Sequence, residues 1–213
     1  MIWSKITDLT LPLKEGMRGY SRDISKTLEK DGWNASTLHL YSHAGTHMDA
    51  PFHFGVSEKT IDDMPLTDFM AKSVVVKIAN VRPGMLVTTN HVKHLDQIEL
   101  KDKGILFQTG WSRYWNDMDS YRNQLPRISE ELANYLVKAG IKLIGVEPPS
   151  VADVNNKKEL TAVHTILLKN NVTIIEGLTN LDKITSEWVT FMALPLKIEN
   201  GDGSPVRALA FEK

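Results

Sequence analysis

The chain is organised around one stretch, Ser42-His43-Ala44-Gly45-Thr46-His47-Met48-Asp49-Ala50-Pro51-Phe52-His53-Phe54. Three histidines and one carboxylate fall between positions 43 and 53, although the whole chain contains only seven histidines. Imidazole and carboxylate together form a ligand set for Zn²⁺, Mn²⁺ or Fe²⁺. A chelate built from one short segment loses little chain entropy when it closes. The stretch therefore predicts a metal site.

The spacing of these side chains restricts the local backbone. In a straight strand His43 and His47 would stand about 13 Å apart, which is too far for one metal at about 2 Å from each nitrogen. A helix would make them neighbours, but Gly45 and Pro51 resist a continuous helix. We therefore expect a tight turn at Ala44-Gly45-Thr46 that brings His43, His47 and Asp49 together.

The same stretch carries a family resemblance. The pattern His-x-Gly-Thr-His-x-Asp-x-Pro-x-His from His43 to His53 resembles the signature of the cyclase-like metal-dependent hydrolases, which include bacterial kynurenine formamidase and isatin hydrolase. The resemblance extends from Asp8-Leu9 almost to the C-terminus, where Pro-Leu-Lys-Ile is followed by Gly-Asp-Gly-Ser-Pro-Val-Arg. The motif is long and specific, unlike a bare glycine-rich match.

A second cluster pairs His164 with Glu176. His164 lies in a segment with helical character, and Glu176 lies at the end of an apolar run that reads as a strand. As isolated residues, a helix histidine and a strand-end glutamate are more often structural. The His-Thr pattern followed by Glu-Gly-Leu resembles the family, which implies that both residues ligate metal.

The resemblance implies a fold and a function for the whole chain. It implies a single α/β domain over residues 1–213, of the swivelling β/β/α type with mixed β-sheets and flanking helices, assembled as a homo-oligomer, usually a dimer. His43, His47 and Asp49 would hold one metal, and His164 and Glu176 a second with Asp49 bridging. His53 would act as general base. Zn²⁺ is the expected ion, with Mn²⁺ possible, at one or two per chain.

The expected reaction is hydrolysis of a carbon–nitrogen bond, with N-formylkynurenine as the leading substrate. A cyclic amide such as an isatin-like lactam is the alternative substrate, and a metal-binding protein without catalysis is the alternative class. Structural zinc sites tend to be closed shells of four ligands, whereas six candidate residues favour an open or two-metal site. No Gly-x-Ser-x-Gly elbow occurs, which argues against a serine hydrolase.

Composition sets further limits on function. The chain has 213 residues, a net charge of -1 and no cysteine, so disulfides, thiolate nucleophiles and cysteine-based zinc sites are excluded. No basic run predicts nucleic-acid binding, and no apolar run is long enough to predict a membrane span. The N-terminal residues do not resemble a signal peptide, so we expect a cytoplasmic protein.

Periodicity and turn residues predict the secondary structure. Residues 15–34 read as a polar loop with a helical turn around 24–30. Trp33 either lines a pocket or packs, and packing is preferred. A surface helix is expected at 91–98, where a metal site at His91 and His94 is disfavoured. Strands are expected at 2–13, 37–41, 73–78, 104–108, 141–147, 172–178, 191–198 and 206–211, and helices at 130–138 and 159–168, the former capped by Ser129.

Several side chains keep two interpretations. Trp111, Tyr114 and Trp115 form either core or a substrate wall. Arg207 could pair with a substrate carboxylate, although a structural ion pair is preferred. Glu147 stands where family members commonly carry Asp, which matters more if it contacts substrate than if it orients a loop.

Overall fold

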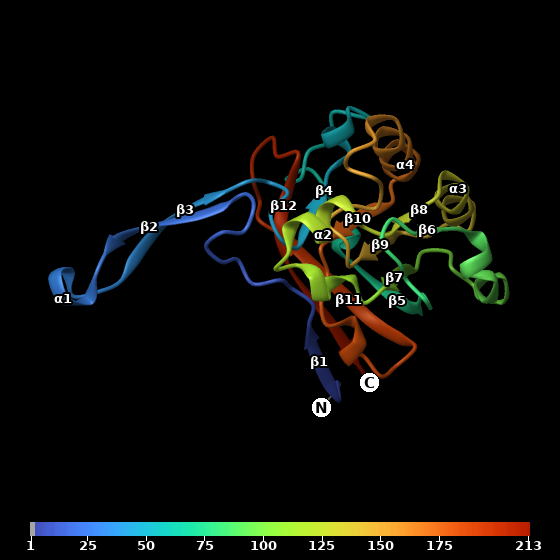
Figure 1. The fold of residues 1–213 in the computed structure, drawn as a ribbon, viewed down its shortest axis with the longest axis horizontal. Coiled ribbons are helices and arrows are strands. Elements are labelled where there is room, and N and C mark those ends of the chain that lie inside the picture. The colour runs from blue at the N-terminus through green and yellow to red at the C-terminus, as the bar shows by residue number, and fades with distance from the viewer. Residues whose placement is uncertain (1–2) are drawn as a thin grey trace.

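The computed structural model describes residues 3–213, so Met1 and Ile2 of the first expected strand lie outside it. Figure 1 shows the elements in chain order. The strands are β1 (Lys5–Asp8), β2 (Tyr20–Lys26), β3 (Ala35–Leu40), β4 (His47–Asp49), β5 (Met70–Lys77), β6 (Leu86–Val87), β7 (Gly104–Gln108), β8 (Arg127–Ile128), β9 (Leu143–Val146), β10 (Thr173–Glu176), β11 (Trp188–Pro195) and β12 (Gly203–Glu212). The α-helices are α1 (Leu28–Asp31), α2 (Met118–Asn123), α3 (Glu130–Lys138) and α4 (Lys157–Lys169).

A mixed eight-stranded sheet forms the body, in the order β1-β12-β11-β5-β7-β9-β10-β4. The steps from β5 through β7 and β9 to β10 are parallel, and the other pairings in the sheet are antiparallel. The short strand β4 pairs with both β10 and β12, so the sheet closes on itself. This closure places β4, which carries His47 and Asp49, against the end of β10, which carries Glu176.

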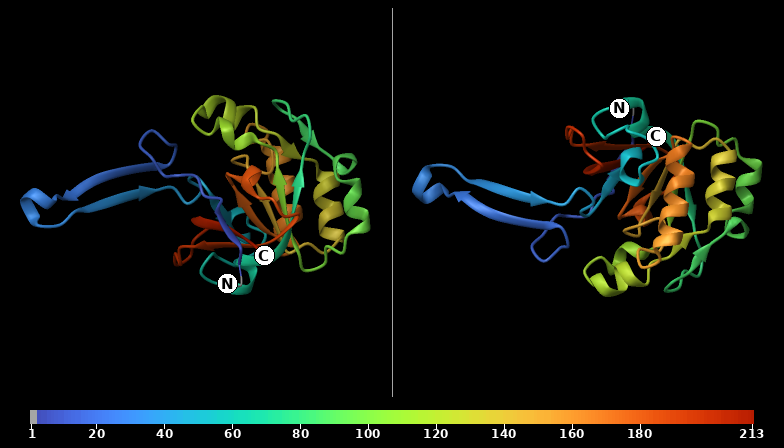
Figure 2. Two further views of the ribbon diagram at one scale, coloured as in Figure 1. Left: turned by 90° about the horizontal axis from the view of Figure 1, so that it is seen from below. Right: turned by 90° about the horizontal axis from the view of Figure 1, so that it is seen from above.

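Two helices cover one face of this sheet. Figure 2 shows α3 and α4 side by side against the parallel strands. The side chain of Ser129 accepts a hydrogen bond from Leu132 N at 3.0 Å and so caps α3, as predicted. Leu136 of α3 and Leu167 of α4 are fully buried against the sheet, which stabilises the fold by about 1.5–3 kcal/mol for each such side chain.

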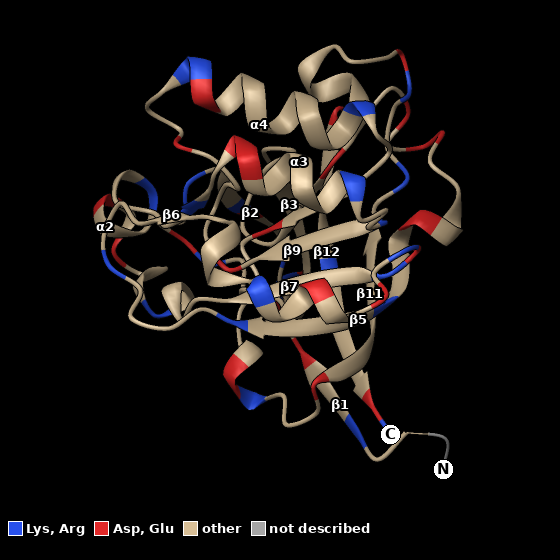
Figure 3. Cartoon of the chain, turned by 90° about the vertical axis from the view of Figure 1, so that its right-hand side faces the viewer, with Lys and Arg blue, Asp and Glu red and all other residues tan. Residues whose placement is uncertain are grey.

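The central strands are apolar because both of their faces are covered. Strands β7 and β9 carry no charged residue, and Figure 3 shows charge gathered instead on helices, loops and outer strands. A continuous apolar run is the expected pattern for a parallel strand buried on both sides. The predicted fold class, an α/β domain with mixed sheets and flanking helices, is confirmed.

Residues 20–40 form a projecting hairpin, of which the sequence predicted only the second strand, at 37–41 where the structure has Ala35–Leu40. Strands β2 and β3 pair antiparallel and are joined through α1, and Figures 1 and 2 show this arm extending away from the body. The predicted polar loop at 15–34 is therefore wrong over β2, and the helical turn occupies only Leu28–Asp31. Most side chains of β2 are exposed, so it lacks the apolar alternation that predicts a strand.

Trp33 lies near the tip of the arm and does not pack. Its side chain is 58% exposed, and Lys26 Nζ lies 6.0 Å from its ring centroid. The expectation that Trp33 is a packed residue is therefore wrong within the single chain. It belongs to a set of exposed apolar side chains on the arm, with Ile24, Leu28 and Leu38.

The polar stretch at 91–98 forms two short 3-10 helices, Thr89–His91 and Lys93–Gln97, in place of one surface helix. The His91 Nδ1 atom accepts a hydrogen bond from Thr88 N at 3.0 Å. His91 therefore caps the first of these helices. Among residues 3–213, no helix is both long enough and apolar enough to cross a membrane.

Candidate metal centre

The predicted turn positions the first ligand candidates. Gly45 has φ +61°, a left-handed conformation that suits glycine, and the chain reverses there before entering β4. The Thr46 hydroxyl donates to Gly177 O at 2.6 Å and ties this turn to the end of β10. A Cβ at Gly177 would lie 2.4 Å from Gly45 O, so only glycine permits this approach.

Strand register then brings the side chains together. His47 and Asp49 are two residues apart on β4 and share a face, and Glu176 of β10 stands directly opposite His47. His164 reaches the same point from α4. All four residues are at least 97% buried. Burial of this many ionisable groups is costly unless they are paired or bind an ion.

The four inner side chains face one another closely. His47 Nε2 lies 3.2 Å from Glu176 Oε2, and His164 Nε2 lies 3.3 Å from Glu176 Oε1 and 3.6 Å from Asp49 Oδ2. Among the described residues, none donates a hydrogen bond to the buried Asp49 Oδ2. One atom each from His47, Asp49 and Glu176 lies within 4.8 Å of the others, a spacing that fits a shared metal ion. The nitrogen and oxygen donors and the unpartnered carboxylate oxygen therefore suit a divalent cation.

Backbone carbonyls orient both inner histidines. His47 Nδ1 lies 3.0 Å from Gly45 O, and His164 Nδ1 lies 2.7 Å from Leu160 O. Donation from Nδ1 to a carbonyl leaves the Nε2 lone pair directed at the cluster, which is the usual support for a metal-binding histidine. Burial opposes protonation of His164, yet Glu176 raises its pKa; burial likewise opposes ionisation of Glu176, but His164 and His47 lower its pKa.

His43 is held by two carboxylates, one of which the sequence interpretation missed. Its Nδ1 lies 2.9 Å from Asp49 Oδ1 and its Nε2 lies 2.9 Å from Asp202 Oδ2. Burial opposes protonation, but Asp49 and then Asp202 outweigh it and raise the pKa of His43 to about 9. Asp202 lies just before β12 in the Gly-Asp-Gly segment, which was noted only as part of the family resemblance and given no role.

His53 lies at the edge of the cluster and opens onto a cavity. It follows β4 in a short 3-10 helix (Pro51–Phe54), and its ring stacks on His43 at a centroid distance of 3.9 Å. Its Nδ1 lies 3.5 Å from Asp202 Oδ2, and its side chain is 26% exposed. Burial lowers the pKa of His53, which favours its neutral form.

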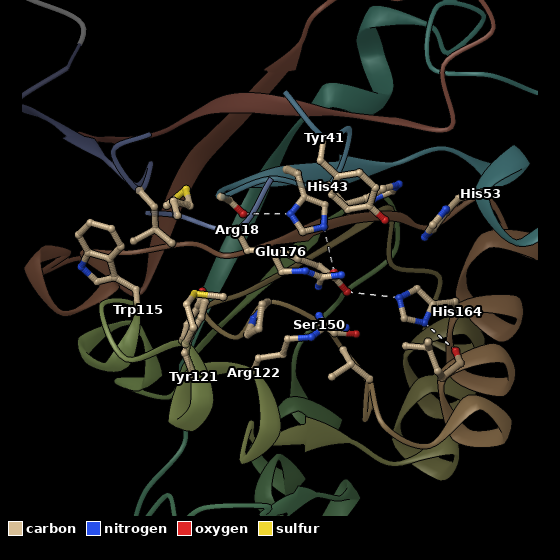
Figure 4. Close-up of a pocket in the computed structure, with 18 of the residues that line it drawn as sticks. Arg18, Tyr41, His43, His53, Trp115, Tyr121, Arg122, Ser150, His164 and Glu176 are labelled. Carbon is tan, nitrogen blue, oxygen red and sulfur yellow. Dashed lines mark hydrogen bonds and ion pairs between the residues drawn. The ribbon is translucent and has the colours of Figure 1, made fainter. Parts of the chain in front are cut away.

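A cavity of about 350 Å³ extends from this cluster. Figure 4 shows His43, His53, His164 and Glu176 around it, together with Trp115 and Tyr121. The structure therefore brings together all six residues singled out from the sequence, and it resolves the aromatic alternatives. Trp111 is buried in the core, whereas Trp115 lines the cavity.

The remaining open residues lie outside the cavity. Arg207 pairs with Asp8 at 2.6 Å on the surface, which confirms the preferred ion pair. The buried Glu147 accepts hydrogen bonds from Thr109 N at 2.7 Å and from the Ser112 hydroxyl at 3.2 Å. Glu147 therefore orients the loop after β7.

The chain has relatives among known protein families. Residues 7–153 match the model of the cyclase family. The chain is 31% identical over 214 residues to the kynurenine formamidase of Bacillus cereus, with 97% of each protein covered. It is 34% identical over 181 residues to the kynurenine formamidase of Geobacillus thermodenitrificans, covering 84% of this chain and 81% of the relative.

Solved structures share the fold. Isatin hydrolase A from Ralstonia solanacearum superposes with a TM-score of 0.89 at 23% identity, covering 98% of this chain and 92% of that one. A metal-dependent hydrolase from Bacillus stearothermophilus superposes with a TM-score of 0.78 at 26% identity, with 98% of each chain covered. Since the family model spans well over half of the sequence, this chain belongs to the cyclase family of metal-dependent hydrolases.

Proposed function

We propose that this chain hydrolyses the carbon–nitrogen bond of an aryl formamide, with N-formylkynurenine as the leading substrate. The main observation behind this proposal is that His47, Asp49, His164 and Glu176 converge on a buried point at the end of a cavity. At that point Asp49 Oδ2 has no hydrogen-bond donor among the described residues. The similarity to curated kynurenine formamidases supports the choice of substrate.

The inner side chains would hold the metal. His47, His164 and Glu176 present their free atoms to a common centre, with Asp49 between them and His43 on its outer side. One or two ions fit the proposal, with Zn²⁺ expected and Mn²⁺ as the alternative. A divalent cation there supplies polarisation of the substrate carbonyl and activation of water.

His53 would move the proton. Its imidazole borders the cavity beside the cluster, and Asp202 lies close to Nδ1 and orients the ring. In the proposed reaction, the ring nitrogen that faces the cavity takes a proton from the attacking water. It then donates that proton to the amide nitrogen as the carbon–nitrogen bond breaks, which gives formate and an arylamine.

The test is hydrolysis of N-formyl-L-kynurenine by purified protein supplied with Zn²⁺ or Mn²⁺, with a chelator-treated sample as control. We expect turnover that is lost with the chelator and restored by one of the two ions. Isatin, tested in parallel, represents the cyclic amide alternative. Hydrolysis of isatin alone would transfer the proposal to lactams, and hydrolysis of neither would leave a non-catalytic metal site.

We also propose that two copies of the chain associate through the arm. A two-stranded hairpin alone is marginally stable in water. This arm exposes Ile24, Leu28, Trp33 and Leu38, which a second copy would cover.

A cytoplasmic location stays a prediction.

Light scattering after size-exclusion chromatography measures the assembly directly. The wild type is expected at twice the chain mass of 24.0 kDa. Replacing Trp33 and Leu38 with serine should shift it toward the monomer, whereas Leu86→Ser, on an exposed residue of the body, should not. A wild-type monomer across the micromolar range would overturn this assembly.

A further inference from the structure

Two arginines from separate segments line the cavity beside the candidate metal centre. Arg18 comes from the loop before β2, and Arg122 comes from α2. In the view of Figure 4, both lie between Trp115 and the histidines His53 and His164. Two positive charges therefore line the cavity beside the metal centre.

Neither guanidinium has a counter-ion among residues 3–213, where no side chain forms a hydrogen bond or ion pair with Arg18 or Arg122. Arg127 and Arg207 are paired, with Glu159 at 2.7 Å and Asp8 at 2.6 Å, whereas Arg113, unpaired among the described residues, lies outside the cavity. The one carboxylate among the described residues that line the cavity, Glu176, is engaged by two imidazoles and by Val151 N at 2.7 Å. The arginine donors are therefore free to bind an anion.

The two positive charges also act on each other. Burial and then the charge of Arg18 lower the pKa of Arg122, while Tyr41 and Glu176 oppose that shift. Like charges that line one cavity repel each other, and a bound anion would offset that repulsion. Guanidinium groups bind carboxylates through paired hydrogen bonds, which suits them to this role.

Both arginines line the same cavity as His47, His164 and Glu176, and Tyr41 lies between Arg18 and the cluster. Arg18 Cζ is 6.0 Å from the Tyr41 ring centroid, and the Tyr41 ring is 5.4 Å from that of His43. Trp115 and Met118 add apolar wall to the same cavity. The cavity thus offers a metal cluster, an apolar wall and a cationic patch to a single small molecule.

We propose that Arg18 and Arg122 form a carboxylate-binding subsite, so that the substrate is an aryl amide that carries an anionic carboxylate. This proposal rests on the proposed hydrolytic function. It narrows the substrates of that function to amides that carry a carboxylate. A neutral amide such as isatin would leave both arginines without a partner.

The test compares N-formyl-L-kynurenine with its carboxyl methyl ester, which differs by the loss of the negative charge. The wild type is expected to favour the acid by about 10-fold or more in kcat/KM, because hydrogen bonds between charged groups are stronger than neutral ones. Arg122→Gln and Arg18→Gln should each lower kcat/KM for the acid by about 10-fold. Both variants should leave the ester within about 2-fold of the wild type, and Arg122→Lys should restore part of the preference.

Arg113→Gln is the matched control. Arg113 is exposed, stacks on Tyr114 at 4.7 Å and does not line the cavity, so its loss removes the same charge without changing the subsite. An equal loss on acid and ester, or an unchanged acid preference in both cavity variants, would overturn the subsite while the hydrolytic function stands.

Calorimetric binding separates this inference from the failure of catalysis. The product L-kynurenine should bind the wild type about 10-fold more tightly than its methyl ester, and Arg122→Gln should remove the difference. If the protein hydrolyses neither formamide, the proposed function fails, and this measurement alone decides the subsite. Equal binding of acid and ester, or no binding of either, would then reject it.

Discussion

Replacing Glu176 with alanine is expected to abolish both metal binding and hydrolysis while the protein stays soluble. Glu176 is the carboxylate that both His47 and His164 face, at 3.2 and 3.3 Å. Removing it leaves the two imidazoles without the carboxylate that they share. Metal affinity is expected to fall by more than the 10–100-fold typical of losing a supporting residue, roughly 100-fold or beyond.

Metal content after dialysis, measured by mass spectrometry of the elements, checks this expectation. Glu199→Ala removes an exposed carboxylate from a surface turn and should keep the wild-type metal content. Glu176 Oε1 also accepts a hydrogen bond from the buried Val151 N at 2.7 Å, so the alanine variant loses a buried contact worth about 1–3 kcal/mol. Glu176→Gln retains an acceptor there and separates loss of metal from loss of stability. Full metal occupancy in both variants would assign Glu176 a structural role.

The core of this site could be predicted because its information is local. His43, His47, Asp49 and His53 fall in one short stretch, and Gly45 indicates the turn that brings three of them together. Helix α3 was equally accessible, since Ser129 caps it and apolar residues repeat along it at helical spacing.

The missed features depend on contacts between distant segments. Asp202 meets His43 only because β4 pairs with β12, and nothing near position 202 signals that pairing. Arg18 and Arg122 likewise meet in the cavity only after folding.

The first strand of the arm was missed for a different physical reason. Strand β2 is exposed on both faces, so no buried face imposes the alternation by which strands are recognised. The apolar residues Ile24, Leu28 and Trp33 of the arm remain uncovered within the chain. The single chain supplies no second surface for these side chains, so its own sequence carries no alternating pattern that marks β2 as a strand.

Replacing His53 with alanine is expected to leave folding and metal content intact and to reduce the hydrolytic rate by about 100-fold or more. The ring borders the cavity and forms a possible ligand group with His43 and Asp49, separate from the buried group of His47, Asp49 and Glu176. Because the buried group stays in place, removal of His53 should cost proton transfer while the metal keeps those ligands. Rates under saturating substrate, with metal content and thermal unfolding on the same samples, give the comparison.

The His53 ring also stacks on His43 at 3.9 Å and meets Phe54 edge-on at 4.6 Å, so alanine removes packing as well as chemistry. His53→Phe retains an aromatic ring but has no nitrogen to carry a proton, and it should be as slow as the alanine variant. His39→Ala removes an exposed histidine of the arm and should keep the wild-type rate. A phenylalanine variant that works at the wild-type rate would show that the ring acts by packing alone. The proton transfer would then have to be assigned to another group at the cluster, and Asp202, which contacts both His43 and His53, would be the first to replace.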